Sequence, residues 1–215
     1  MSERRFLLAT RSAGKLREMR EIFSEFGLPV VDVGSAGFEE TPAENELESF
    51  DTFEENALAK ARYFFDRSGG MPTFADDSGM SVDALGGEPG VMSKRWSGRT
   101  DLSGQALDDS NNARLLARMD DARSGDPSGF TDAARYVCVA AFKDSKGELV
   151  RRGEIEGRVL RHPRGEGGFG YDPYFEAPDL SGTFAEASIE RTSRVSHRSR
   201  AFRALLSALR DEGRI

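Results

Sequence analysis

Phe74-Ala75-Asp76-Asp77-Ser78-Gly79-Met80 is the stretch around which the rest of the chain is best understood. An apolar approach leads to two neighbouring carboxylates, and we expect a turn of small residues that holds Asp76 and Asp77 together. Side-by-side carboxylates repel each other, so such a turn indicates a cation, and Mg²⁺ prefers carboxylate oxygens. Ser78 and Gly79 add a hydroxyl and backbone N–H groups that suit a phosphate. An ordinary exposed turn is the alternative.

The bulk properties exclude several classes of protein. The chain has 215 residues, and its hydrophobic content of 38% suffices for a core. Its net charge of -7 argues against binding nucleic acid through a general basic surface. The single cysteine, Cys138, excludes an intrachain disulfide, and we expect it to be a small buried side chain. The absence of disulfides fits a protein of the reducing cytoplasm. The apolar run Phe6–Ala9 is too short for a signal segment or a membrane span.

The N-terminal segment has the pattern of an anion-binding site. A short buried strand over residues 6–9 is followed by Thr10-Arg11-Ser12-Ala13-Gly14-Lys15 and by a predicted helix over residues 16–26. Free N–H groups and the helix dipole at such a junction favour anions. The glycine and lysine spacing of a P-loop is absent, and a plain strand-to-helix connection explains the segment equally well.

The remaining segments predict alternating strands and helices. We expect a strand over residues 30–33, a loop over 39–49, and a helix from a capping box at Thr52 to Arg67. Asn56 and Lys60 lie off the apolar stripe of that helix, as a solvated pair or as a pair that reaches a phosphate. A helix over residues 103–119, a hairpin of 135–143 with 147–157, and a final helix from Ser196 follow.

A glycine-rich segment near the C-terminal third combines flexibility with aromatic side chains. Residues 164–173 contain four glycines, Phe169 and Tyr171. Glycines let the backbone approach a flat ligand, and the rings offer stacking faces. A glycine-rich hairpin corner with core aromatics is the competing interpretation.

Taken in order, these segments resemble the Ham1/inosine triphosphatase family of non-canonical purine nucleoside triphosphate pyrophosphatases. The resemblance spans nearly the whole chain. It implies one α/β domain over residues 1–215, elongated and two-lobed, with a mixed twisted sheet, flanking helices and a nucleotide cleft between the lobes. It also implies a homodimer. The motifs that carry it are Leu8–Lys15, Thr52–Ala57, Ala75–Gly79, Leu85–Gly90, Asn111-Asn112, Gly167–Pro173 and Ser196-His197-Arg198.

The resemblance also implies roles for individual residues. The phosphates would be held by Thr10, Arg11, Ser12, Ala13, Gly14, Lys15 and Ser78. The base and sugar would contact Phe169, Gly170, Tyr171, Asp172 and Thr192, and His197 and Arg198 would recognise the purine 6-keto oxygen. Mg²⁺ would be bound by Glu48, Asp76 and Asp77, with Glu44 as the fallback for Glu48. Asp77 would be the general base that activates water for attack at phosphorus, releasing a monophosphate and pyrophosphate.

Two departures from the family pattern bear on the substrate. Ser12 stands where the family usually has Asn, and Thr192 stands where it usually has a Lys of the nucleotide pocket. The expected activity is Mg²⁺-dependent hydrolysis of the purine nucleotides ITP, dITP and XTP, which sanitises the nucleotide pool. The alternatives are a pyrophosphatase with altered base specificity and a nucleotide sensor that does not hydrolyse its ligand. Retention of Lys15, Asp76 and Asp77 favours catalysis.

Overall fold

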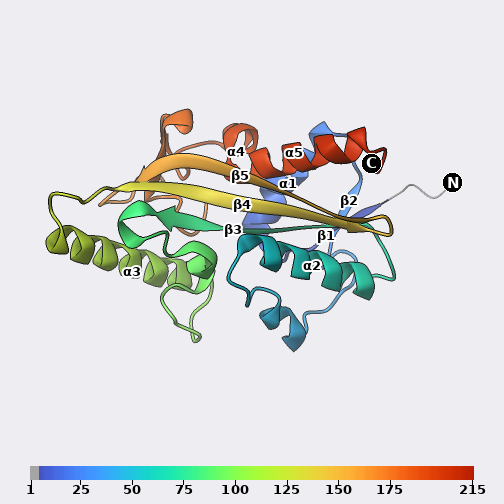
Figure 1. The fold of residues 1–215 in the computed structure, drawn as a ribbon, viewed down its shortest axis with the longest axis horizontal. Coiled ribbons are helices and arrows are strands. Elements are labelled where there is room, and N and C mark those ends of the chain that lie inside the picture. Colours follow the sequence, from blue (N-terminus) through green and yellow to red (C-terminus); the bar gives the residue numbers. More distant parts are fainter. Residues whose placement is uncertain (1–4) are drawn as a thin grey trace. The chain divides into compact units, whose positions relative to one another are not determined.

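The structure, a computed structural model, describes residues 5–215 (Figure 1). Its strands form one seven-stranded sheet in the order β2-β1-β3-β4-β5-β6-β7. β1 is parallel to β2 and to β3, whereas β6 is antiparallel to β5 and β7, so the sheet is mixed. The strands are β1 (Phe6–Leu8), β2 (Val30–Asp32), β3 (Thr73–Val82), β4 (Ala133–Asp144), β5 (Gly147–Val159), β6 (Phe175–Ala177) and β7 (Gly182–Thr183).

Within the described part of the chain, five α-helices and four short 3₁₀ helices accompany the sheet. The α-helices are α1 (Ala13–Glu25), α2 (Phe53–Arg67), α3 (Gly104–Gly125), α4 (Ile189–Val195) and α5 (His197–Asp211). The 3₁₀ helices are η1 (Pro42–Glu46), η2 (Asp83–Leu85), η3 (Gly90–Arg95) and η4 (Pro178–Leu180). Among the helices of residues 5–215, none combines the length and the hydropathy that a membrane-spanning helix needs.

The chain forms two compact units, and strands β3, β4 and β5 contribute residues to both. The first unit contains residues 5–77 together with Cys138–Gly153 and Ser196–Ile215. The second contains Ser78–Val137 and Glu154–Val195.

The core of the first unit lies between the sheet and the helices α1 and α5. Its buried apolar residues alternate along β1 and β4 and recur at helical spacing on α1 and α5, in line with the two-residue period of strands and the 3.6-residue period of helices. The fully buried rings of Phe23, Phe74 and Phe202 form its centre, and Phe23 meets Phe74 edge-on at 4.7 Å between centroids. Because α1 and α5 cover the face to which Phe74 points, the side chain of Asp76, two residues later, faces the same two helices.

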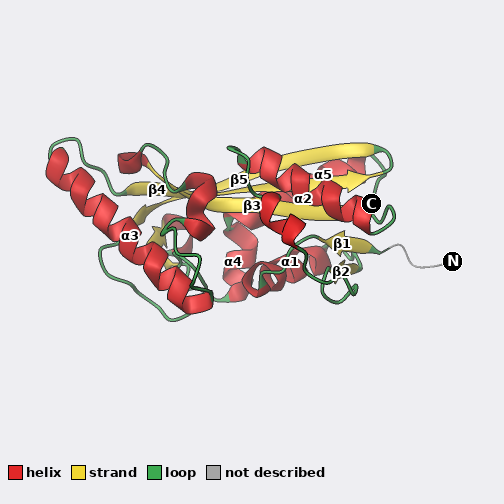
Figure 2. Cartoon of the chain, turned by 90° about the horizontal axis from the view of Figure 1, so that it is seen from below, coloured by secondary structure: helices red, strands yellow, loops and turns green. Residues whose placement is uncertain are grey.

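The second unit has a separate core built on β4, β5, β6 and α3. Its buried apolar residues include Leu115 and Met119 of α3, which pack with Tyr136 and Phe175 from the strands. α3 is one uninterrupted helix, as Figure 2 shows. Two distinct cores therefore support the two units.

The structure confirms the predicted α/β class and most of the predicted elements. Thr52 caps α2 through Glu55 N, and Ser196 caps α5, as their sequence patterns predict. Cys138 is free and buried, as expected. The prediction for α3 was too short, because the helix continues to Gly125 through a charged segment without an apolar stripe. The nucleotide cleft between lobes stays a prediction.

Candidate functional site

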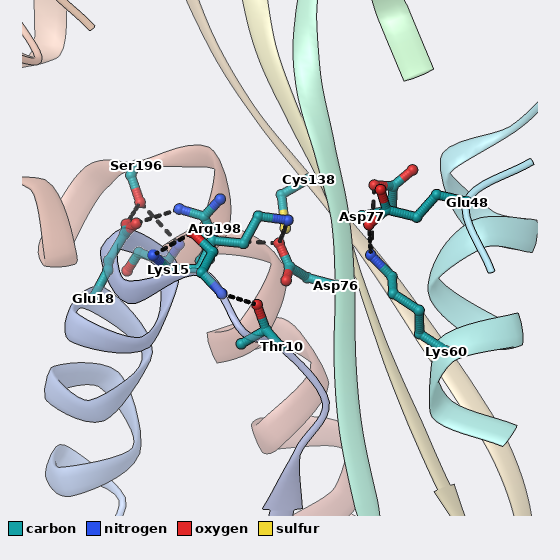
Figure 3. A network of polar contacts seen from close by, with 12 residues as sticks. Thr10, Lys15, Glu18, Glu48, Lys60, Asp76, Asp77, Cys138, Ser196 and Arg198 are labelled. Carbon is teal, nitrogen blue, oxygen red and sulfur yellow. Dashed lines mark hydrogen bonds and ion pairs between the residues drawn. The ribbon is translucent and has the colours of Figure 1, made fainter. Parts of the chain in front are cut away.

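The central acidic pair lies in a strand, and the predicted turn is wrong. Asp76 and Asp77 are consecutive residues of β3, which continues from Thr73 to Val82. Successive side chains of a strand point to opposite faces of the sheet. Asp76 therefore faces α1 and α5, whereas Asp77 faces α2 (Figure 3). Flanking apolar residues, buried on both faces, explain why the polar pair continues the strand.

Asp77 is held by two side chains of α2. Asn56 Nδ2 donates to Asp77 Oδ2 at 2.8 Å, and Lys60 Nζ lies 3.6 Å from Asp77 Oδ1. Asn56 and Lys60 are four residues apart, so they share one face of α2. Both are buried, at 0% and 8% exposure, which rules out the solvated-pair interpretation. Asn56 Oδ1 also accepts from Phe50 N, and this fixes the orientation of its amide.

Glu48 joins the same group from the loop that precedes α2. Its Oε1 accepts from Lys60 Nζ at 2.6 Å, and Figure 3 shows its carboxylate beside that of Asp77. Burial raises the pKa of Asp77, and the negative charge of Glu48 raises it further against the opposing effect of Lys60. Burial alone would lower the pKa of Lys60, but Glu48 and Asp77 raise it to about 12. Lys60 is therefore a permanent cation between two carboxylates.

Glu44, the fallback for Glu48, has a different set of partners. Its carboxylate accepts from Arg11 Nε at 2.7 Å and from Arg67 Nη1 at 3.0 Å. It also closes a capping box on η1 with Thr41. The hydrogen bond from Arg11 is the main reason why the pKa of Glu44 is lowered. Glu44 thus fastens its loop to Arg11 and α2, and Glu48 is the glutamate that meets Asp77.

Asp76 faces a separate cluster of charged groups. Its Oδ2 lies 3.0 Å from Lys15 Nζ and 3.3 Å from Arg198 Nε, and Asp76 is fully buried. Glu18 of α1 pairs with Arg198 Nη1 and accepts from the hydroxyl of Ser196. Two carboxylates and two cations thus compensate one another beneath α1 and α5.

The electrostatics of this cluster fix its protonation states. Burial would raise the pKa of Asp76, but Lys15 and Arg198 hold it well below its usual range. Burial and the neighbouring Arg198 lower the pKa of His197, so its imidazole is neutral at physiological pH. Asp76 therefore stays ionised, and its carboxylate forms ion pairs with both cations.

The predicted phosphate loop is the N-terminus of α1. Ser12 is the N-cap, and its hydroxyl accepts from Lys15 N at 3.4 Å. Thr10 Oγ1 accepts from Ser12 N and shapes the loop before the helix. Ser and Asn are equally good N-caps, so the Ser12 departure preserves the local structure. Arg11 extends outward from the loop to Glu44, whereas Lys15 reaches Asp76.

The other predicted ligand residues, Ser78, Phe169–Asp172 and Thr192, belong to the second unit. Gly170 there is fixed by two side chains of α3, because its N–H donates to Asp108 and its carbonyl accepts from Asn112. The φ angle of Gly170 is 62°, in the left-handed region that favours glycine. Thr192 is buried and its hydroxyl donates to Ile189 O, one turn earlier in α4.

Sequence reasoning left three residues of the first unit out of the candidate site. Asn56 and Lys60 contact Asp77 directly, and the signal was their spacing of four on one helix face. Glu18 follows Lys15 by three residues, which places both on one face of α1. Its partner Arg198 is 180 residues away in sequence, and no local pattern connects them.

The donor set on the α2 side of β3 fits a hard divalent cation. Glu48 and Asp77 present facing carboxylates, and Mg²⁺ typically takes one or two protein carboxylates and completes its shell with water and phosphate. Asp76, on the opposite face, does not join this pair. Within residues 5–215, no three acidic, histidine or cysteine side chains converge to hold a metal by themselves.

Comparison with known proteins places these residues in context. A model described as "Ham1 family" matches residues 6–208. A dITP/XTP pyrophosphatase of Frankia alni is 45% identical over 208 residues, which cover 96% of this chain and 98% of the relative.

Solved structures agree with the sequence comparison. A HAM1 protein from Coxiella burnetii matches with a TM-score of 0.79 and 30% identity, covering 96% of this chain and 98% of its own. A nucleoside-triphosphatase / dITP/XTP pyrophosphatase from Mycobacterium abscessus matches with a TM-score of 0.66 and 39% identity, covering 94% and 98%.

Proposed function

Because the chain belongs to the Ham1 family, we propose that it is a nucleoside triphosphate pyrophosphatase that sanitises the nucleotide pool. Its proposed substrates are the non-canonical purine nucleotides dITP, XTP and ITP, which it cleaves to the monophosphate and pyrophosphate. One observation carries the catalytic part of the proposal. Asp77 is a buried carboxylate with a raised pKa, and Asn56 and Lys60 fix its position. A general base with a pKa moved toward neutrality suits proton transfer at physiological pH.

The proposed chemistry follows from the positions of the side chains. Asn56 holds Asp77 Oδ2, and Asp77 orients and deprotonates a water for in-line attack at the α-phosphorus. Lys60 and Lys15, on opposite faces of β3, supply positive charge against the negative charge that develops on the phosphates. Backbone N–H groups at the start of α1 add further donors.

Glu48 and Asp77 are the residues that would hold Mg²⁺. When bound, the ion supplies Lewis-acid charge to the phosphate oxygens. The two carboxylates face each other, whereas Asp76 is engaged with Lys15 and Arg198 on the other face. We therefore propose Glu48 and Asp77 as ligands and Asp76 as a residue that positions Lys15.

Recognition of the base is proposed to use His197 and Arg198. Arg198 is 2% exposed and its guanidinium is held by Glu18 and Asp76, so it is a fixed donor. A fixed donor favours the 6-keto oxygen of hypoxanthine and xanthine over the 6-amino group of adenine. We propose that Phe169–Asp172 contribute the base and sugar contacts, because Asp108 and Asn112 hold Gly170 in a defined conformation.

A changed base preference is the second candidate function. The Thr192 hydroxyl donates to Ile189 O, so it does not replace the ammonium of the family's lysine. If that lysine selects the base, its loss redirects selectivity while the groups around Asp77 stay intact.

The test is an assay with Mg²⁺ and a panel of ITP, dITP, XTP, ATP, GTP, dUTP and CTP, with pyrophosphate and orthophosphate measured separately. Pyrophosphate from ITP, dITP and XTP, with little turnover of the standard nucleotides, supports the proposal. Turnover of another base supports the second candidate. The Asp77→Asn variant should lose turnover but bind nucleotide, and an active variant would remove Asp77 from the role of base. Binding without turnover by the unmodified protein would identify a sensor.

We further propose a homodimer in the cytoplasm. The molar mass from light scattering tests the first point, since one chain has a mass of 23.6 kDa.

A further inference from the structure

Lys60 lies between the two carboxylates that fit a divalent cation. Its ammonium is 2.6 Å from Glu48 Oε1 and 3.6 Å from Asp77 Oδ1. Lys60 is only 8% exposed, so its charge depends on these partners more than on water. It acts as an internal counter-ion for Glu48 and Asp77.

An ammonium and a divalent cation compete for the same oxygens. Mg²⁺ binds carboxylate oxygen at about 2.0–2.1 Å and requires nearly ideal octahedral geometry. The Glu48 oxygen that carries the lysine hydrogen bond is therefore a poor ligand until that bond is broken. The two cations also repel each other at this separation, and burial strengthens the repulsion.

We propose that Lys60 and the divalent cation are alternative partners of the Glu48–Asp77 pair, so that cation binding releases the lysine ammonium toward the triphosphate. This inference rests on the proposed function for the identity of the anion. A lysine is suited to such an exchange because its compact charge sits on a flexible four-carbon stem. Asn56 keeps Asp77 in place during the exchange, because its bond is to the other oxygen, Oδ2.

The exchange couples the two ligands of the site. A cation that frees Lys60 for phosphate raises the affinity for nucleotide, and by linkage the nucleotide raises the affinity for the cation by the same factor. In the protein without nucleotide, Lys60 lowers the affinity for the metal. In a metal site without an internal competitor, metal binding would not release a lysine and would not be coupled to nucleotide binding in this way.

The first experiment measures Mn²⁺ binding to the nucleotide-free protein by electron paramagnetic resonance. Lys60→Met should tighten Mn²⁺ binding at least tenfold. Arg62→Met is the matched control, because it removes one positive charge from the same helix while Arg62 is exposed and pairs with Glu148. Its effect should stay within twofold. Equal effects of the two variants, weaker binding by Lys60→Met, or no binding by either protein at millimolar Mn²⁺ would overturn the inference.

A second measurement uses the unmodified side chain. Acetylation by a lysine-directed reagent, read by mass spectrometry, should be slow at Lys60 and rise several-fold on addition of Mg²⁺. The exposed Lys146 is the internal reference and should not change. The rise should disappear in Asp77→Asn. Constant protection of Lys60 at saturating Mg²⁺ would refute the exchange. Neither readout involves turnover, so failure of the inference is distinguishable from failure of the proposed activity.

Discussion

Replacing Asp76 by asparagine tests whether this carboxylate is the anion that holds Lys15 and Arg198. The change keeps the shape of the side chain but removes a fully buried charge that lies 3.0 Å from Lys15 Nζ and 3.3 Å from Arg198 Nε. Breaking a buried ion pair from one side costs about 3–5 kcal/mol, because the partner charge is left uncompensated. Arg198 keeps Glu18, and the Lys15 side chain is 16% exposed and can reach water. We therefore expect a loss near the lower end, about 3 kcal/mol.

The loss should depend on pH with a defined sign. The pKa of Asp76 is lowered in the folded protein relative to its ordinary value of 3.8. A lowered pKa stabilises the fold above the unfolded value, and this contribution disappears as the pH falls toward the folded value. The difference between wild type and Asp76→Asn should be constant above about pH 5 and should shrink below about pH 4.

Urea denaturation at a series of pH values measures this difference. The double variant with Lys15→Met should show a coupling energy of about 0.5–3 kcal/mol, because the two groups are in contact. A difference below about 1 kcal/mol at pH 7, the value typical of exposed pairs, would refute the argument. A difference that stayed constant down to pH 3 would also refute it.

Three further predictions address neighbouring residues. Glu48→Gln should raise the Mg²⁺ concentration for half-maximal activity at least tenfold, whereas Glu44→Gln should leave that concentration nearly unchanged. Glu44→Gln should instead lower the free energy of unfolding in urea by about 1 kcal/mol, because it weakens the contacts with Arg11 and Arg67. Equal effects of the two variants on the Mg²⁺ requirement would contradict the choice of Glu48 over Glu44 as the metal ligand. Asn56→Ala should move the acidic limb of the kcat/KM profile to higher pH, because the Asn56 hydrogen bond lowers the pKa of Asp77 and its removal raises that pKa. An unmoved limb would show that another group titrates. Ser12→Ala should cost about 1 kcal/mol as a lost N-cap, and Ser12→Asn should be nearly neutral; melting curves that rank them otherwise would contradict the capping role.

Local chemistry predicted much of the first unit. The capping residues Ser196 and Thr52 predicted the starts of α5 and α2. The apolar stripes of α1 and α5 predicted the helix faces that bury Phe23 and Phe202. These signals lie within a few residues of the structure that they specify. The sequence therefore predicted the elements even where it did not predict what they contact.

The site required information that no local pattern carries. Asp-Asp-Ser-Gly has the composition of a turn, and β3 persists through it because tertiary contacts override local preference. Asp76 contacts Arg198, and Asp77 contacts Asn56 and Lys60, only when the sheet and the helices are packed together. Arg198 lies 122 residues from Asp76 in the sequence, and Asn56 lies 21 residues from Asp77.

The strand geometry changes the reason for assigning catalysis to this pair. As a turn, Asp76 and Asp77 would repel each other and need a shared cation, whereas on opposite faces of β3 each has its own. Their environments push the two pKa values apart, downward for Asp76 beside Lys15 and Arg198 and upward for buried Asp77 beside Glu48. Paired groups with divergent pKa values mark a division of roles in catalytic sites. We therefore propose that Asp76 is the fixed anion that positions the cations and that Asp77 is the group that exchanges a proton.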